Sequence, residues 1–159
     1  MAEFPNRKKN RLQGDLYCQP GAYFITICAD KHSCVFWTDS SANVADDLPL
    51  SATGMIAQQH IIDIPSHYDK VLSIDKYVVM PNHVHILFAI HPDEILKSPD
   101  IRHVVRHYKS AVTHHIGYSV WQKGFHDRIV RDMREYSAIW KYIDENPVKW
   151  IADEYYANQ

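Results

Sequence analysis

Two apolar segments joined by a two-residue turn place the strongest constraint on the fold. Residues 71–80 and 83–90 are rich in Val, Ile and Leu, and only Pro81-Asn82 separates them. This composition is typical of strands, and so short a connection permits only antiparallel pairing. The sequence therefore predicts a hairpin around which the rest of the chain must fold.

Two further segments have the composition of strands. Residues 23–28 are aromatic and β-branched and follow the turn residues Pro20-Gly21. Residues 121–130 contain a second group of aromatic and β-branched side chains. We predict a strand in each segment, which makes four strands in all.

Residues 101–116 have the spacing of an amphipathic helix, because apolar residues recur there every three or four positions. We interpret Ser98-Pro99 as its N-cap and first-turn proline. A shorter helix is predicted to begin at about Leu50 and to stop near Pro65.

A third helix is predicted near the C-terminal end. Asp132 is its expected N-cap, Glu135 a capping-box partner three residues later, and Pro147 its expected end.

The predicted order of elements is β, α, β, β, α, β, α. It favours an α+β fold of ferredoxin-like type, a βαββαβ antiparallel sheet with an additional C-terminal helix. At 159 residues, we expect a single domain over residues 1–159, with residues 1–20 as a flexible basic N-terminal arm. This fold hosts many activities, so function must be argued from a site.

Composition narrows the class of protein. The chain is 46% apolar and 23% charged, which is typical of a globular protein, and its net charge of -2 excludes an overall basic surface. The three cysteines form no Cys-x-x-Cys pair, which indicates a reducing compartment. No apolar run reaches the roughly 18 residues of a membrane span, so we expect a soluble, cytoplasmic protein.

Histidine is unusually frequent, with eleven residues, and two of them form a His-x-His pair. Side chains alternate along a strand, so His83 and His85 share one face while Val84 points to the other. Two imidazoles at this spacing can converge on one metal ion. The alternative is that one histidine is a packed core residue and the other sits at the exposed start of the strand.

Two residues of the last predicted helix form a second candidate group. Tyr142 and Asn146 lie one turn apart on the flank of its apolar stripe. Together with the histidines they suit phosphodiester chemistry, in which a divalent ion polarises the phosphate and the tyrosine is the nucleophile. Alternatively, Tyr142 closes the edge of the core, and Asn146 only ends the helix before Pro147.

Three ordered blocks of sequence resemble a known family. They are Tyr-Val-Val-Met-Pro-Asn-His-Val-His-Ile-Leu at 77–87, Trp-Gln-Lys-Gly-Phe-His-Asp-Arg at 121–128 and Tyr-Ile-Asp-Glu-Asn-Pro-Val-Lys at 142–149. In these blocks the chain resembles the REP-associated tyrosine transposases and related single-domain HUH transposases. The likeness also includes residues 11–28, although Ala29 and Lys31 stand where Thr and Arg are usual.

The resemblance implies a site and a reaction. His83, His85 and Asn146 are expected to ligate Mg²⁺ or Mn²⁺. Tyr142 is expected to attack single-stranded DNA beside a hairpin, forming a 5′-phosphotyrosine intermediate and releasing a 3′-OH. The expected partner is therefore single-stranded or hairpin DNA, and no association with a membrane is expected. The resemblance also suggests a homodimer.

Basic residues in three regions are candidates for nucleic-acid binding. They are Arg7, Lys8, Lys9 and Arg11 near the N-terminus, Arg106 and Lys109 on the 101–116 helix, and Lys123, Arg128 and Arg131 after it. A simply solvated helix face and a disordered arm are the alternatives.

The main hypothesis is a metal-dependent single-strand DNA endonuclease and strand transferase, a transposase active in DNA recombination. A non-catalytic hairpin DNA- or RNA-binding module derived from a transposase is the alternative. A metal-dependent nuclease that uses water as the nucleophile is a third hypothesis.

Overall fold

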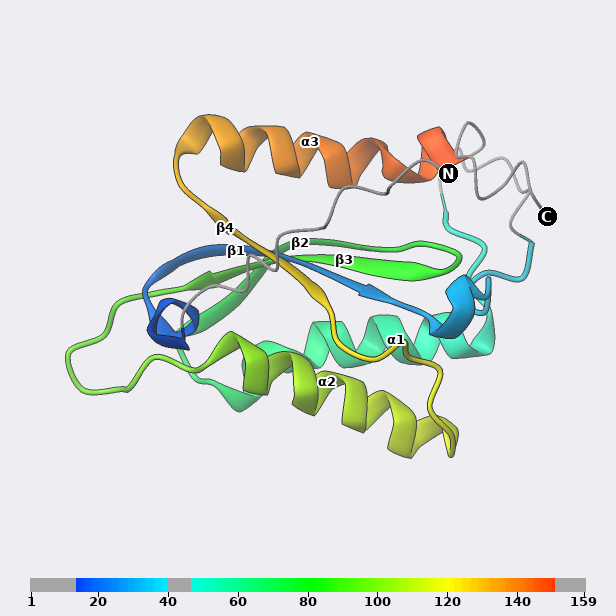
Figure 1. Ribbon diagram of the computed structural model, residues 1–159, viewed down its shortest axis with the longest axis horizontal. Coiled ribbons are helices and arrows are strands. Elements are labelled where there is room, and N and C mark those ends of the chain that lie inside the picture. The colour runs from blue at the N-terminus through cyan, green and yellow to red at the C-terminus, as the bar shows by residue number, and fades with distance from the viewer. Residues whose placement is uncertain (1–13, 40–46, 151–159) are drawn as a thin grey trace, which may run out of the picture.

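A four-stranded antiparallel sheet separates one helix from the other two (Figure 1). The structure is a computed structural model that describes residues 14–39 and 47–150. The strands are β1 (Gly21–Cys28), β2 (Leu72–Val79), β3 (His83–Ile90) and β4 (His126–Val130). The helices are α1 (Ala52–Asp63), α2 (Ile101–Ile116) and α3 (Met133–Lys149), with short 3-10 helices at Gly14–Cys18, Asp30–His32 and Ile64–His67.

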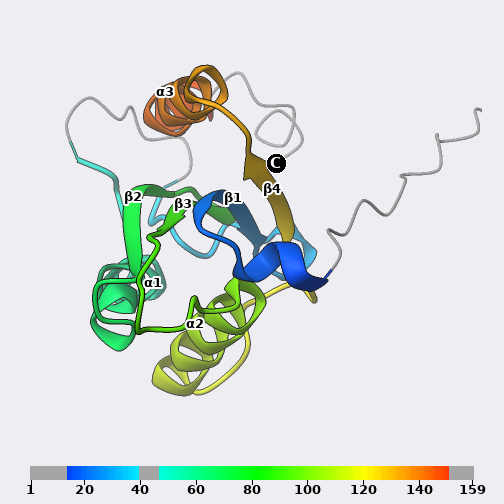
Figure 2. The same ribbon diagram turned by 90° about the vertical axis from the view of Figure 1, so that its left-hand side faces the viewer.

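The strand order β2-β3-β1-β4 confirms the predicted ferredoxin-like arrangement. α1 and α2 lie side by side on one face, and α3 covers the other (Figures 1 and 2). β3 and β1 occupy the centre, and the predicted hairpin forms with β2 at one edge. The additional helix thus encloses the face that two helices leave open.

Alternation along the central strands divides the core into two layers. Tyr23, Ile25 and Ile27 of β1 are buried on one face, while Phe24 and Thr26 point to the other. Phe24 and Thr26 lie on the side of α3, where Phe24 contacts Tyr142. Tyr23, Ile25 and Ile27 therefore face α1 and α2. The sheet therefore has apolar contacts on both faces, which a chain with only two helices would lack.

The boundaries of two elements differ from the prediction. α2 is capped by Asp100, whose side chain accepts from the Arg102 N–H at 2.8 Å, and not by Ser98. Strand β4 begins at His126, because Trp121 makes only an isolated bridge with Ala29. The composition of residues 121–130 indicates a strand, but it does not show which of these residues pair with another strand.

The start of α3 follows the prediction and its end does not. Asp132 accepts from the Glu135 N–H at 2.8 Å, and the Glu135 carboxylate accepts from the Arg131 N–H at 2.7 Å. The return bond thus goes to the residue before the N-cap. Pro147 lies inside the helix, which continues to Lys149. The proline lacks an N–H, but its carbonyl accepts from the Trp150 N–H, so the chain keeps turning beyond it.

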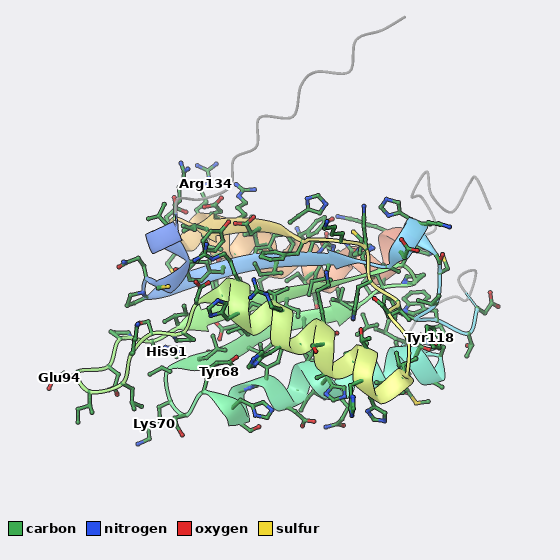
Figure 3. All side chains as sticks on the ribbon, turned by 60° about the horizontal axis from the view of Figure 1, so that its bottom comes forward. Tyr68, Lys70, His91, Glu94, Tyr118 and Arg134 are labelled. Carbon is green, nitrogen blue, oxygen red and sulfur yellow. The ribbon has the colours of Figure 1, made fainter. Side chains whose placement is uncertain are left out.

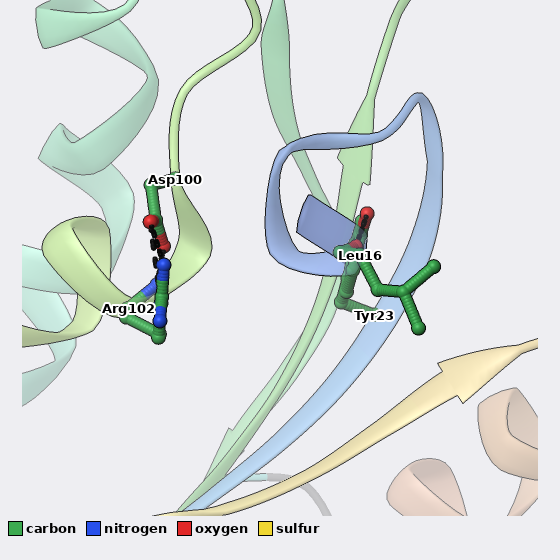
Figure 4. A network of polar contacts seen from close by, with 4 residues as sticks. All are labelled: Leu16, Tyr23, Asp100 and Arg102. Carbon is green, nitrogen blue, oxygen red and sulfur yellow. Dashed lines mark hydrogen bonds and ion pairs between the residues drawn. The ribbon is translucent and has the colours of Figure 1, made fainter. Parts of the chain in front are cut away.

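Part of the expected N-terminal arm belongs to the folded body. Gly14–Cys18 forms a 3-10 helix, and Tyr17 is buried with the Arg102 guanidinium 4.7 Å from the centre of its ring. The Tyr23 hydroxyl lies 2.7 Å from Leu16 O (Figure 4). It also lies 2.5 Å from Gln19 O, so the two carbonyls share its proton. These contacts attach residues 14–20 to β1 and α2, and residues 1–13 of the expected arm lie outside the described residues.

The Tyr23 bonds generate a stability prediction. Tyr23→Phe keeps the buried ring but leaves two carbonyls without their donor, which costs about 1–2 kcal/mol. Urea unfolding should show that loss, whereas Tyr118→Phe, on an exposed side chain just after α2 (Figure 3), should leave the midpoint unchanged. Equal midpoints for both variants would contradict a role for the Tyr23 hydroxyl.

Candidate functional site

The two histidines of β3 converge on the face of the sheet that α3 covers. Their Nε2 atoms lie 3.0 Å apart. His85 is buried, with 4% of its surface exposed, and His83 is half-buried. The two side chains therefore share one face of the strand, as predicted for a metal-binding pair. The burial of His85 and the partial exposure of His83 also match the alternative of one packed and one exposed histidine.

Neighbouring side chains orient both imidazoles. Asn82, which is buried in the turn, places Oδ1 2.6 Å from Nδ1 of His83, so that Nδ1 donates and Nε2 carries a lone pair. Thr26, opposite His85 in the β1–β3 register, places Oγ1 2.8 Å from Nδ1 of His85. When Nδ1 of His85 donates to Thr26, both Nε2 lone pairs face each other, an arrangement that a proton or a metal ion between them would stabilise.

The spacing of these nitrogens suits a metal ion. Two ligands about 2.1 Å from one ion and at right angles to each other lie about 3.0 Å apart. Among the described residues, however, no group of three or more His, Cys, Asp or Glu side chains is placed to hold a metal. The pair alone therefore offers two ligands, and an amide, water or substrate oxygen would have to supply the rest of a coordination sphere.

Burial keeps His85 in the form that binds metals. Desolvation, together with the adjacent His83, holds the pKa of His85 well below its usual range. The imidazole is therefore neutral near pH 7, with a lone pair available for a cation.

Tyr142 lies directly against His85 of this pair. Its ring is 5.3 Å from that of His85 and 6.1 Å from Phe24, with an edge-on angle of 88° to Phe24. Nearly half of its surface, 46%, is exposed. The predicted position on the flank of the apolar stripe is thus correct, since Ile139 and Ile143 are the buried residues of α3.

Two polar contacts attach α3 to the edge strand β2. The Tyr136 hydroxyl donates to Asp75 at 2.7 Å, and Lys76 pairs with Asp144 at 2.8 Å. Burial and the Asp75 carboxylate raise the pKa of Tyr136 to about 12, so its hydroxyl remains a donor. These contacts hold the helix at the height that brings Tyr142 over His85.

Asn146 lies one turn beyond Tyr142 on α3 and is half-buried. Its role as a metal ligand stays a prediction from the family resemblance. On the other side of the pair, the buried Trp150 ring lies 6.5 Å from His83.

A cavity of about 750 Å³ opens beside the histidines, between α3 and the β1–β4 half of the sheet. Its walls include Thr26, His85, His126, Arg128, Glu135 and Tyr142. Arg128 and Glu135 form an ion pair across it. The cavity therefore combines imidazoles, a phenol and an ion-paired guanidinium with the carboxylates of Asp127 and Glu135.

The basic residues predicted to bind nucleic acid are divided between two regions. Arg128 lines the cavity with Tyr142, and Arg131 is exposed just before α3. Arg106, Lys109 and Lys123 line a second cavity of about 490 Å³ beside α2. Arg7, Lys8, Lys9 and Arg11 lie outside the described residues.

Lys109 has a structural role in addition to its charge. Its Nζ donates to the carbonyls of Gln122 and Gly124, each at 2.9 Å, and burial lowers its pKa. It thereby holds the loop that precedes β4.

Sequence reasoning did not identify Thr26, Phe24, His126 or Glu135 as site residues. Alternation places Thr26 and Phe24 on one face of their strand, but only the register puts Thr26 opposite both His85 and His126. The sequence predicts Glu135 only as a capping residue. Its ion pair with Arg128 in the cavity depends on how α3 packs on the sheet.

The described residues contain no helix that is both long and apolar enough to cross a membrane. No protein-family profile matches the chain. A Haemophilus influenzae protein named "Uncharacterized protein" is 29% identical over an alignment 175 positions long, gaps included, which covers 96% of this chain and 94% of that protein.

A solved structure of a REP-associated tyrosine transposase bound to a REP hairpin has the same fold. It superposes with a TM-score of 0.66 and 21% identity, covering 89% of this chain and 73% of that one. The fold expected from the sequence resemblance is thus confirmed, and this chain shares the fold of that REP-associated tyrosine transposase structure.

Proposed function

We propose that the chain is a metal-dependent single-strand DNA endonuclease and strand transferase of the REP-associated tyrosine transposase family. The observation that carries the proposal is the position of Tyr142 over the His83–His85 pair, at the wall of one cavity. A nucleophile and a pair of metal ligands are groups that phosphodiester transfer can use, and Arg128 is a nearby cation in the same wall.

His83 and His85 would hold Mg²⁺ or Mn²⁺ through their Nε2 atoms, and Asn146 is the third ligand that the resemblance suggests. When bound, the cation neutralises charge on the phosphate oxygens and polarises phosphorus. Asn82 and Thr26 keep the imidazole lone pairs directed to one point.

The reaction proposed for Tyr142 conserves the energy of the broken bond. The phenol loses its proton, and its oxygen forms a bond to phosphorus. The bond from phosphorus to the 3′ oxygen breaks, and that oxygen takes up a proton. The product is a 5′-phosphotyrosine and a free 3′-OH, and attack by another 3′-OH reverses the step on a new strand.

The substrate proposed is single-stranded DNA beside a hairpin. The superposed transposase was solved bound to a REP hairpin. In this chain Arg128 lines the same cavity as Tyr142. Arg106 and Lys123 line the second cavity beside α2, where they could contact further phosphates. A homodimer stays a prediction, which sedimentation of the protein would test.

One observation favours a second function, a non-catalytic module that binds hairpins. The described residues place no third His, Cys, Asp or Glu side chain with the histidine pair. A module of this kind would bind hairpin DNA without metal and form no covalent product.

Tyr142→Phe separates the two functions. Incubation of the wild-type chain with hairpin-containing single strands and Mn²⁺ should give a covalent adduct, visible by denaturing electrophoresis and located on Tyr142 by peptide mass mapping. The variant should form no adduct and keep its affinity for the hairpin, because only the nucleophilic oxygen is removed. Tyr118→Phe is the matched control, and an adduct that persists in Tyr142→Phe would exclude this nucleophile.

The two histidines should differ when each is replaced by alanine. Both variants should lose Mn²⁺ binding by calorimetry. His83→Ala should lose less stability than His85→Ala, because His83 is half-buried at the strand's start and water can replace its ring beside the Asn82 amide. His85→Ala should lose about 1–3 kcal/mol, because the partly buried Thr26 hydroxyl loses its partner. Unchanged Mn²⁺ affinity in both variants would contradict the metal site.

Thr26 is proposed as a positioning residue for His85. Thr26→Val preserves shape but removes the hydrogen bond, and should weaken Mn²⁺ binding about 10-fold or more. Thr113→Val, a half-buried threonine on α2, is the control and should bind Mn²⁺ as the wild type does.

A further inference from the structure

A second pair of histidines joins the two helices on the opposite face of the sheet. His60 lies in the last turn of α1 and His115 in the last turn of α2. Nε2 of His60 and Nδ1 of His115 are 3.1 Å apart, and their rings meet edge-on at 5.3 Å and 89°. The two helices pack side by side, which brings together residues 55 positions apart in the chain (Figures 1 and 3).

This pair is separate from the site proposed for DNA. α1 and α2 cover one face of the sheet, whereas His83, His85 and Tyr142 lie on the face beneath α3 (Figure 2). His60 also lines a cavity of about 430 Å³ between α1 and α2, whose walls include Asp63, His67 and His107. The two pairs therefore share no side chain and no cavity.

The spacing and chemistry of the pair suit a transition-metal ion. Nitrogen ligands about 2.1 Å from a common ion lie about 3.0–3.4 Å apart for angles between 90° and tetrahedral. Two imidazoles from different helices already meet this distance. Imidazole nitrogen favours Zn²⁺, Ni²⁺ or Cu²⁺ over Mg²⁺, which prefers oxygen ligands.

The surroundings keep His60 available as a ligand. Desolvation, followed by the neighbouring His115, lowers the pKa of His60, so the imidazole is neutral at pH 7. In the absence of an ion, one ring N–H donates to the other ring nitrogen. A bound ion would replace that shared proton with little movement of either helix.

We propose that His60 and His115 bind a borderline divalent cation, with Zn²⁺ as the representative ion, and so fasten α1 to α2. Water completes the coordination, because the described residues contain no group of three or more His, Cys, Asp or Glu side chains placed to hold a metal. The ion connects the two helices that pack beneath β1 and β3, and it therefore stabilises the folded chain by binding it in preference to the unfolded one.

The test measures Zn²⁺ binding and thermal stability and does not depend on activity. The full chain carrying His83→Ala, which disrupts the first pair, is titrated with Zn²⁺ by calorimetry and melted with and without the ion. One ion should bind, and the melting temperature should rise by about 5 °C or more at 100 times the dissociation constant. Mg²⁺ at the same concentration should give no rise.

Two variants in the same background identify the ligands. Adding either His60→Ala or His115→Ala should abolish both the bound ion and the rise, and His115 is exposed, so that variant should fold. His114→Ala, the adjacent exposed histidine, is the matched control and should retain both. Zn²⁺ binding and stabilisation that persist without His60 or His115 would overturn the proposal, as would absence of binding before they are removed.

Discussion

The pairing of β1 with β3 at the centre of the sheet is the interaction on which the candidate site depends. Its register sets Thr26 opposite His85 and Cys28 opposite His83. A slip of one residue would turn the side chains of β1 to the opposite faces of the sheet. His85 would then lack the Thr26 hydroxyl that orients it. Ile25 and Ile27 are buried on the face opposite Thr26, and a slip would move both side chains out of that apolar layer. Their burial therefore opposes the slip. Core packing and site geometry are therefore maintained by the same strand pairing.

The position of Tyr142 depends on a local irregularity in the edge strand. β2 changes register between Ile74 and Lys76, where Asp75 has no partner on β3. Asp75 instead accepts from the hydroxyls of Ser73 and Tyr136, so the irregular residue becomes an anchor for α3. A β-bulge and one tyrosine thereby help to hold the tyrosine proposed as nucleophile over the histidines.

The sheet also keeps two histidine pairs apart, and each pair has a different environment. His85 is buried and oriented by a threonine, while His60 and His115 join two helices at the opposite surface. Mg²⁺ or Mn²⁺ is the ion proposed for the first pair, where phosphate and amide oxygens would complete the coordination, and Zn²⁺ is the ion proposed for the second. These two pairs include four of the eleven histidines.

Local spacing in the sequence by itself determined the hairpin, the common face of His83 and His85, the amphipathic 101–116 helix and the flank position of Tyr142. These features follow from strand and helix periodicity, which involves neighbouring residues only. Pro147 and Ser98 were misleading, because a helix boundary also depends on which hydrogen bonds the surrounding structure completes. Only the tertiary structure decided that Thr26 and Tyr142 meet His85 and that His60 meets His115. Those contacts depend on strand register and helix docking across more than 50 residues, and no local pattern constrains them.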